Sequence, residues 1–293
     1  MAEALPAAAQ RRAKLLRRTR VGGGLALGLG LLLWGVAAAG SGKLVFAIAA
    51  GLGLLAASEA GGLLSKHPRS GRALGALAGL AAAGPWWLAL GRGPGLPSAA
   101  PIVAYGLAFA LAALCALPLR PREPAERSWA LPAWFWLAWV SAPLAGLSAV
   151  YARLGESGAG ARELIALIVL SKVGDIVGYY GGSAFGRHHP FPRLSPGKTS
   201  EGCFASLLGA LLAAAILAQT GVLRLPLGSA LLIGAAINLA SQAGDLLESR
   251  LKRSLAVKDS GSLFGPSGGF LDLVDSLLLS IPVALALWPA LTT

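Results

Sequence analysis

Six acidic side chains fall within or beside apolar stretches of this chain, where an ionised carboxylate is costly and commonly serves a function. They are part of only 13 acidic residues in 293, and they are Glu59, Asp175, Asp245, Glu248, Asp272 and Asp275. Asp272 and Asp275 are three positions apart on an expected helix, so their carboxylates share a helix face. The same spacing places Asp245 and Glu248 on one face. Carboxylates without a nearby Cys–His cluster favour a hard cation such as Mg²⁺ over Zn²⁺.

Two charged segments accompany these carboxylates, "GRHHPFPRLSPGKTSEG" (186–202) and "SRLKRSLAVKDSGSLFGPSGGFLDLVDS" (249–276). Each combines basic side chains with a glycine-containing turn just before an expected helix. The backbone N–H groups of such a turn can hold an anion. Neither segment has the spacing of a Walker A motif. Together with the carboxylates, the segments predict a polyphosphate and its metal at a membrane surface, beside a second, lipid-borne substrate.

Several of these residues also have a purely structural interpretation. Lys172 and Asp175 could form an ion pair within one helix, which would allow both charges to lie in the membrane. Asp272 and Asp275 could act only on the dipole of the helix that they begin. Glu59 stands alone among small residues, which favours a structural role.

The segment 186–202 has a structural interpretation as well. His188 and His189 have no third soft ligand close in sequence, which favours a solvated loop over a metal site. The turn "SPGKT" could be a plain loop in which Thr199 caps the following helix.

Membrane helices must position these residues, because the composition excludes a water-soluble protein. Hydrophobic residues make up 55% of the chain, charged residues 13%, and the mean hydropathy is +0.67. A soluble protein carries about 25% charged residues. The length suits one membrane domain with spans of about 20 residues each. Cys115 and Cys203 lie in or beside apolar runs, which excludes a disulfide framework and a Cys-based metal site.

The apolar runs predict an all-α integral membrane protein with about nine transmembrane helices. The expected spans are 21–40, 44–64, 73–91, 100–119, 131–152, 164–185, 203–223, 228–247 and 268–291. The run 73–91 is the weakest, because small residues dominate it and Pro85 interrupts it. We expect a basic tail over 1–20, N-terminal helices over 21–160 and C-terminal helices with the catalytic motifs over 161–293, all in one membrane domain.

The charges between these spans predict the orientation. The tail and the loops after every second span carry 19 Lys and Arg residues, whereas the opposite side carries five. By the positive-inside rule, the N-terminus and the segments 186–202 and 248–267 are cytoplasmic and the C-terminus is outside. The basic tail and the first apolar run also have features of a cleaved signal peptide, although the run is long for one.

The segment 249–276 resembles the signature of the phosphatidate cytidylyltransferase family, also called CDP-diacylglycerol synthases. The matching positions are Ser249, Leu251, Lys252, Arg253, Lys258, Asp259, Gly261, Phe264, Gly265, Gly268, Gly269, Phe270, Asp272, Val274 and Asp275. "GD" at 244–245, "SPGKTSEG" at 195–202 and Asp175 are also similar to this family, so the resemblance covers roughly 172–276. Two positions depart from the signature, because Ser267 replaces the family His and Leu273 replaces the family Arg.

The resemblance implies transfer of CMP from CTP to phosphatidate in phospholipid biosynthesis, giving CDP-diacylglycerol and pyrophosphate. It implies Mg²⁺ as the cofactor, CTP, phosphatidate and membrane lipid as partners without nucleic acid, and a homodimer. The enzyme would be a multi-pass protein of the cell (inner) membrane with its active face in the cytoplasm. The implied catalytic residues are Lys258, Asp259, Asp272 and Asp275, and the implied metal ligands are Asp245, Asp272 and Asp275. The implied substrate-binding residues are Ser195, Lys198, Thr199, Ser249, Lys252, Arg253, Gly268 and Gly269. Further residues of the implied polar cavity are Lys172, Asp175, Glu201, Glu248 and Ser267.

Three other functions fit part of the sequence. A CTP-dependent lipid kinase of the polyprenol or phytol type would use similar residues, but it would release CDP where the transferase releases pyrophosphate. A diverged, inactive homologue would explain the two departures from the signature. A transporter would also carry charges within its spans, but these charges cluster toward one face and form no path across the membrane.

Overall fold

The computed structural model describes residues 24, 28, 31–32, 34–35, 38–90, 100–121, 123, 131–152, 159–265 and 268–292. Over these residues the chain is helical, and six helical segments are long and apolar enough to cross a membrane. The protein is therefore an all-helical, multi-pass membrane protein. The predicted count of nine spans is not confirmed, because the expected tail 1–20 and most of the expected span 21–40 lie outside the described residues.

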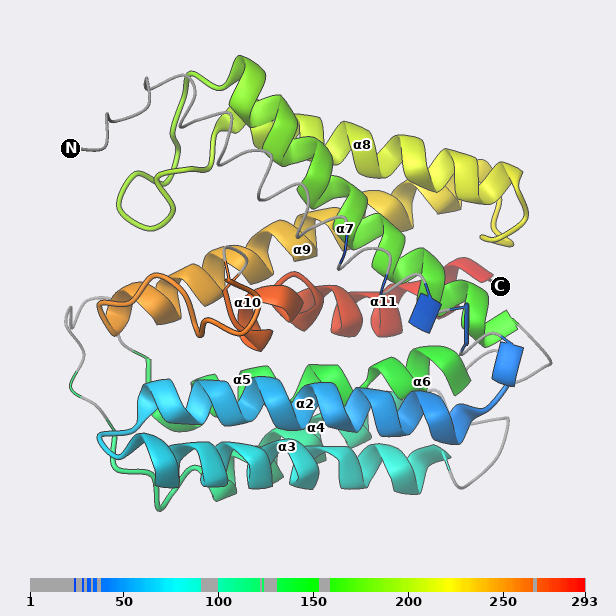
Figure 1. Cartoon of the computed structure of the whole chain (residues 1–293). Coiled ribbons are helices and arrows are strands. Elements are labelled where there is room, and N and C mark those ends of the chain that lie inside the picture. The colour runs from blue at the N-terminus through cyan, green and yellow to red at the C-terminus, as the bar shows by residue number, and fades with distance from the viewer. Residues whose placement is uncertain are drawn as a thin grey trace.

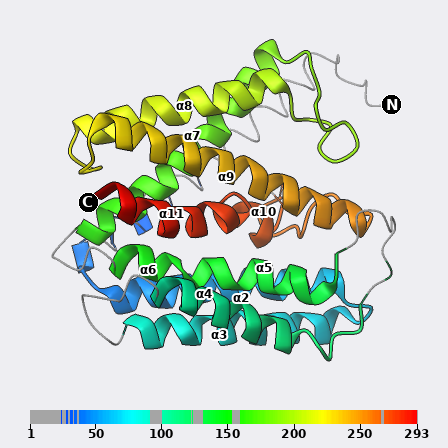
Figure 2. The ribbon, with the colours of Figure 1, turned by 180° about the vertical axis from the view of Figure 1, so that it is seen from behind.

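The helices form two layers (Figure 1). One layer contains α2 (Gly42–Leu64), α3 (Pro68–Leu90), α4 (Ala100–Cys115), α5 (Ala133–Ala145) and α6 (Leu147–Ala152). The other contains α7 (Ala159–Phe185), α8 (Ser200–Gln219) and α9 (Leu227–Ser254). Between the layers lie α10 (Phe270–Val274) and α11 (Leu277–Thr292), where α10 contacts α2 and α11 contacts α5 and α9. The view from behind shows the same order of layers (Figure 2).

Small residues bring α2 and α3 into backbone contact. Gly71, Gly75 and Gly79 recur every four residues on α3, and a Cβ atom at any of them would collide with the backbone of α2. The residues that they face on α2 recur with the same spacing and are Gly61, Ala57 and Gly53. Such stripes of small residues let membrane helices approach closely. Residues 68–90, which include nearly all of the expected span 73–91, form one continuous helix despite Pro85.

The helix α9 is longer than the sequence predicts. The segment 248–254 was expected in a loop, but it forms the last two turns of α9. Glu248 and Lys252, spaced i,i+4, form a buried ion pair there, with 2.5 Å between Oε2 and Nζ. Lys252 and Arg253 also suit a helix C-terminus, where the dipole favours cations.

Two expected spans are each broken into two helices. The span 131–152 breaks at Gly146, three residues after Pro143, which lacks the N–H that a helix interior requires. The span 268–291 breaks at Asp275 and Ser276, where Asp275 Oδ1 accepts a hydrogen bond from the Ser276 N–H at 2.5 Å. Aspartate competes in this way with the backbone bonds of a helix. The second break leaves a carboxylate inside the bundle.

The loops after α2, α4, α7 and α9 meet at one end of the bundle, the left end in Figure 1. Lys66 N donates to Arg120 O at 3.0 Å, which joins the loops after α2 and α4. Arg253 Nε donates to Leu194 O at 3.4 Å, which joins the end of α9 to the loop after α7. The basic loops therefore lie together, as the predicted alternation requires, and the side of the membrane that they face stays a prediction.

A candidate metal and phosphate site

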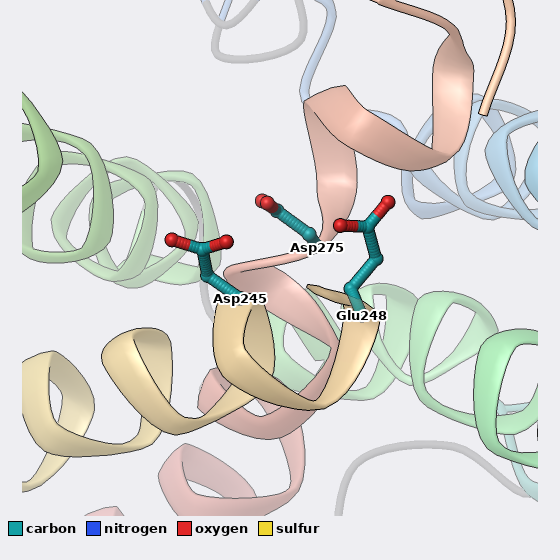
Figure 3. Close-up of side chains that lie close together, drawn as sticks. All are labelled: Asp245, Glu248 and Asp275. Carbon is teal, nitrogen blue, oxygen red and sulfur yellow. The ribbon is translucent and has the colours of Figure 1, made fainter. Parts of the chain in front are cut away.

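Three carboxylates converge where α9 passes the break between α10 and α11 (Figure 3). Asp245 and Glu248 project from one face of α9, and Asp275 projects from the break. One oxygen of each carboxylate lies within 4.8 Å of the others. The spacing predicted that Asp245 and Glu248 share a face, but only the helix break brings Asp275 to them.

Glu248 shows that this triad fits a cation. Its side chain is fully buried; Oε2 pairs with the Lys252 ammonium group, whereas Oε1 has no hydrogen-bond partner among the described residues. A buried carboxylate oxygen without a donor is unfavourable unless a further cation approaches it. Three carboxylates in an oxygen-only set suit Mg²⁺ better than a soft metal.

Asp272 lies beside the triad and is held by other groups. Its Oδ1 pairs with Lys252 Nζ at 2.6 Å. Its Oδ2 accepts hydrogen bonds from Ser260 N at 2.8 Å, Ser260 Oγ at 2.6 Å and Gly269 N at 2.7 Å. Both oxygens therefore contact the protein itself, and Asp272 as a metal ligand stays a prediction that this geometry does not favour.

Lys172 ties α7 to the break between α10 and α11. Its Nζ donates to Ser276 Oγ at 2.6 Å and to Leu273 O at 3.0 Å, and it lies 3.5 Å from Asp175 Oδ2. The expected ion pair of Lys172 with Asp175 is thus present, but the ammonium group also caps the last carbonyls of α10. A cation stands beside residue 273 even though the Leu273 side chain is apolar.

Lys198 brings the loop after α7 onto α9. Its Nζ lies 2.8 Å from Asp245 Oδ2 and donates to Gln242 O at 3.2 Å. The next residue, Thr199, caps α8 by accepting a hydrogen bond from Gly202 N at 3.1 Å, as one interpretation of the turn predicted. The cap fixes the start of α8 and so directs Lys198 toward the carboxylates.

A cavity of about 450 Å³ lies between these groups. Its walls come from α7, α8, α9 and the loop 186–199, and the charged residues that line it are Lys172, Asp175, Lys198, Asp245, Asp272 and Asp275. This volume is in the range of small-molecule sites. The cavity therefore joins six of the residues that the sequence singled out, with carboxylates and ammonium groups on one continuous surface.

Other predicted site residues do not line this cavity. Arg253 donates to the carbonyls of Leu194 and Val257, and so holds two loops together. Lys258 and Asp259 are exposed, Ser195 is half-buried and Ser249 is buried. Ser267 lies outside the described residues.

The predicted cavity residue Glu201 belongs to the N-terminal turn of α8. Its Oε1 lies 2.6 Å from His188 Nδ1, and its Oε2 accepts hydrogen bonds from the N–H groups of Arg187 and His188. His188 and His189 are both exposed, as expected for a solvated loop, although His189 also lines the cavity. Glu201 therefore orders the loop that carries Lys198.

The glycine turn before α10 was expected to hold an anion through its N–H groups. In the structure, Gly269 N donates to Asp272 and Leu271 N donates to Glu59 Oε2 at 2.8 Å. Gly268 adopts a φ of +83°, which favours glycine, and packs against Asp272. Two carboxylates of the protein thus occupy donors that the sequence assigned to phosphate.

Two amide side chains of α9 also belong to this region, although they were not predicted from the sequence. Gln242 Nε2 donates to Asn238 Oδ1 at 2.7 Å, and Asn238 Nδ2 donates to Ser206 Oγ at 2.9 Å. Gln242 lines the cavity. Polar residues within a span commonly bond across helices, so their i,i+4 spacing was a usable signal that a search for ionisable groups overlooked.

Comparison with known proteins identifies the family of the chain. Residues 18–290 match the sequence profile described as "Cytidylyltransferase family". The chain belongs to this family. It is similar to "Uncharacterized protein YnbB" of Escherichia coli, with 39% identity over 42% of this chain and 41% of that protein. It is also similar to "Phosphatidate cytidylyltransferase" of Aquifex aeolicus, with 36% identity over 38% of this chain and 41% of that protein.

A further relative is the "Phosphatidate cytidylyltransferase" of Pseudomonas aeruginosa, with 44% identity over 43% of this chain and 48% of that protein. These matches span about two fifths to half of each relative. Family membership covers nearly the whole chain, whereas the substrates in the relatives' names apply to this protein only by proposal.

Proposed function

We propose that this membrane protein transfers CMP from CTP to phosphatidate, giving CDP-diacylglycerol and pyrophosphate. The observation that carries the proposal is the carboxylate triad, two members of which, Asp245 and Asp275, line one cavity together with Lys198 and Lys172. Carboxylates for a metal beside cations for phosphate are what the joining of two polyanions requires. The family membership and the names of two of the relatives support the same substrates.

In this reaction a phosphate oxygen of phosphatidate attacks the α-phosphorus of CTP. The new P–O bond joins the two phosphates, and the bond from the α-phosphorus to the bridging oxygen breaks, so that pyrophosphate leaves. The attacking oxygen is already ionised near neutral pH, so no strong general base is needed. The protein must instead position both substrates and compensate their negative charge.

The residues of the cavity divide these tasks between them. Asp245, Glu248 and Asp275 would hold Mg²⁺, which stabilises charge on phosphate oxygens when it is bound. Lys198 would bind a phosphate group, exchanging its present contact with Asp245 for the substrate. Lys172 holds the main chain at the break and thereby orients Asp275.

We place this site on the cytoplasmic face of the cell (inner) membrane. The basic loops that meet at one end of the bundle support this orientation through the positive-inside rule. CTP would enter the cavity from that face, and phosphatidate would come from the adjoining leaflet.

The test is turnover by purified protein with CTP, phosphatidate and Mg²⁺. We expect one pyrophosphate per CDP-diacylglycerol, and no product when EDTA removes the divalent cation. Release of CDP with a phosphorylated lipid would show a lipid kinase instead. Absence of both products, with a folded protein in lipid and a range of phosphatidates, would overturn the proposed function.

A further inference from the structure

Glu59 reaches from the N-terminal layer into the loop that precedes α10. Its Oε2 accepts a hydrogen bond from Leu271 N at 2.8 Å and lies 2.8 Å from Ser260 Oγ, whose single hydroxyl hydrogen it shares with Asp272 Oδ2. These partners follow Glu59 in the chain by more than 200 residues and flank the glycine turn of the signature segment. One carboxylate on α2 therefore contacts both ends of the loop 260–271.

Two glycines of the loop pack directly on this carboxylate. A Cβ atom at Gly261 or Gly269 would collide first with the Glu59 carboxylate. The backbone of Gly269 has φ −101° and ψ −165°, which any residue can adopt. A Cβ atom at this position would displace the Glu59 carboxylate, whereas the backbone conformation itself would accept one.

Asp272 contacts the same serine as Glu59. Ser260 Oγ lies within hydrogen-bond distance of both Glu59 Oε2 and Asp272 Oδ2, and Asp272 pairs with Lys252, which also contacts Glu248. A continuous set of polar contacts thus leads from α2 to the carboxylate triad. A shift of the loop end would move Asp272 and, three residues later, Asp275.

We infer that Glu59 is a positioning residue, which holds the loop 260–271 so that Asp272 and Asp275 keep their places in the site. It touches neither the triad nor the cavity wall, so it acts through the loop. The inference rests on the proposed function for its kinetic test, whereas its structural test does not. The N-terminal layer would thereby contribute to catalysis by positioning Asp272 and Asp275.

The kinetic test compares Glu59→Ala with Glu59→Gln. A displacement of about 1 Å in a catalytic group can cost about a hundredfold in rate. We therefore expect Glu59→Ala to lower kcat by about ten- to a hundredfold with less than about a threefold change in KM for CTP. Glu59→Gln keeps an oxygen that can accept both hydrogen bonds, so it should stay within about fivefold of the wild type.

The matched control is Glu123→Gln, because Glu123 pairs with Lys66 at 3.2 Å on the exposed surface of the same end. It should leave kcat unchanged. Wild-type kcat in Glu59→Ala, or an equal loss in Glu59→Gln and Glu59→Ala, would overturn the inference.

A double-mutant cycle with Gly269→Ala tests the packing. Gly269→Ala alone should lower kcat, because its new methyl group displaces the carboxylate. In the Glu59→Ala background that collision is absent, so the second substitution should add little. Fully additive effects would contradict the inference.

Hydrogen exchange and proteolysis provide a readout without substrate. In Glu59→Ala, the amides of 268–272 should exchange faster and trypsin should cut after exposed Lys258 more quickly, with the remaining helices unchanged. An unchanged loop would overturn the inference even if the enzyme proved active. A loosened loop in a protein without turnover would support the inference and count against the proposed function alone.

Discussion

The two layers of the bundle hold their helices together in different ways. Among helices α2–α6, Glu59 is the only acidic residue, and α2 meets α3 through glycine and alanine. In the second layer and in α10 and α11, ion pairs and hydrogen bonds of Lys172, Lys198 and Lys252 join helices and loops. The comparison indicates a scaffold layer that contributes shape and a single carboxylate, and a second layer that contributes the chemistry.

The largest loss of activity is expected when one negative charge is removed from the triad. Asp275→Asn is nearly isosteric and takes away one of three carboxylates that we assign to the metal, so turnover should fall by about a thousandfold or more. The measurement is pyrophosphate release across a Mg²⁺ titration. Glu123→Gln, the same kind of change at the exposed pair with Lys66, should have no effect. Normal turnover of Asp275→Asn with unchanged Mg²⁺ dependence would remove Asp275 from the site.

A smaller loss of activity is expected from a substitution in the loop after α7. Lys198→Met removes a cation that contacts Asp245 across the cavity. A hydrogen bond to a charged group contributes about 1.5–3 kcal/mol, so kcat/KM for CTP should fall by about ten- to a hundredfold. Lys198→Arg should retain part of the wild-type kcat/KM. The control Lys66→Met, at the same end of the bundle, should leave kcat/KM unchanged. An unaltered kcat/KM in Lys198→Met would limit Lys198 to holding the loop.

In the scaffold layer, substitutions away from Glu59 should change stability while leaving the chemistry intact. Gly75→Ala places a methyl group against the Ala57 carbonyl of α2, and overpacking of this kind costs about 1–3 kcal/mol. Gly51→Ala on α2 meets no atom within 4 Å and should be neutral or slightly stabilising. Thermal unfolding in detergent distinguishes the two. An equal melting temperature for both would show that the contact between α2 and α3 is not tight.

Much of the fold could be predicted from the sequence, because apolar length and loop charge are local properties. The described helices fall where the apolar runs predict them, and Asp245 and Glu248 share a face as their spacing requires. The two helix breaks and the extension of α9 were missed. The break at Gly146 follows Pro143, and the extension of α9 contains the i,i+4 pair of Glu248 with Lys252, so both had local signals that were not used. The break at Asp275 and Ser276 also involves Lys172 of α7, a contact that no local pattern contains.

The residue types of the candidate site could be predicted from the sequence, but their arrangement could not. Carboxylates, lysines and glycines were identified, but their partners were not. Glu59 looked structural because it is isolated in sequence, and the N–H groups of Gly269 and Leu271 looked available to an anion. Contacts between residues more than 200 positions apart decide the role of Glu59 and of the Leu271 N–H, and spacing along one helix carries no information about them, whereas the Gly269 N–H is taken by Asp272, three positions later.

The backbone contact between α2 and α3 has a consequence for how the protein responds to the bilayer around it. Two helices in backbone contact cannot slide past each other, so a bilayer that is too thin or too thick tilts them as one rigid body. That tilt would move Glu59 and, through its contacts, the segment 260–271. Turnover in vesicles of graded acyl length should therefore show an optimum thickness, and Glu59→Ala should flatten the dependence. The protein would then respond to the thickness of the surrounding membrane.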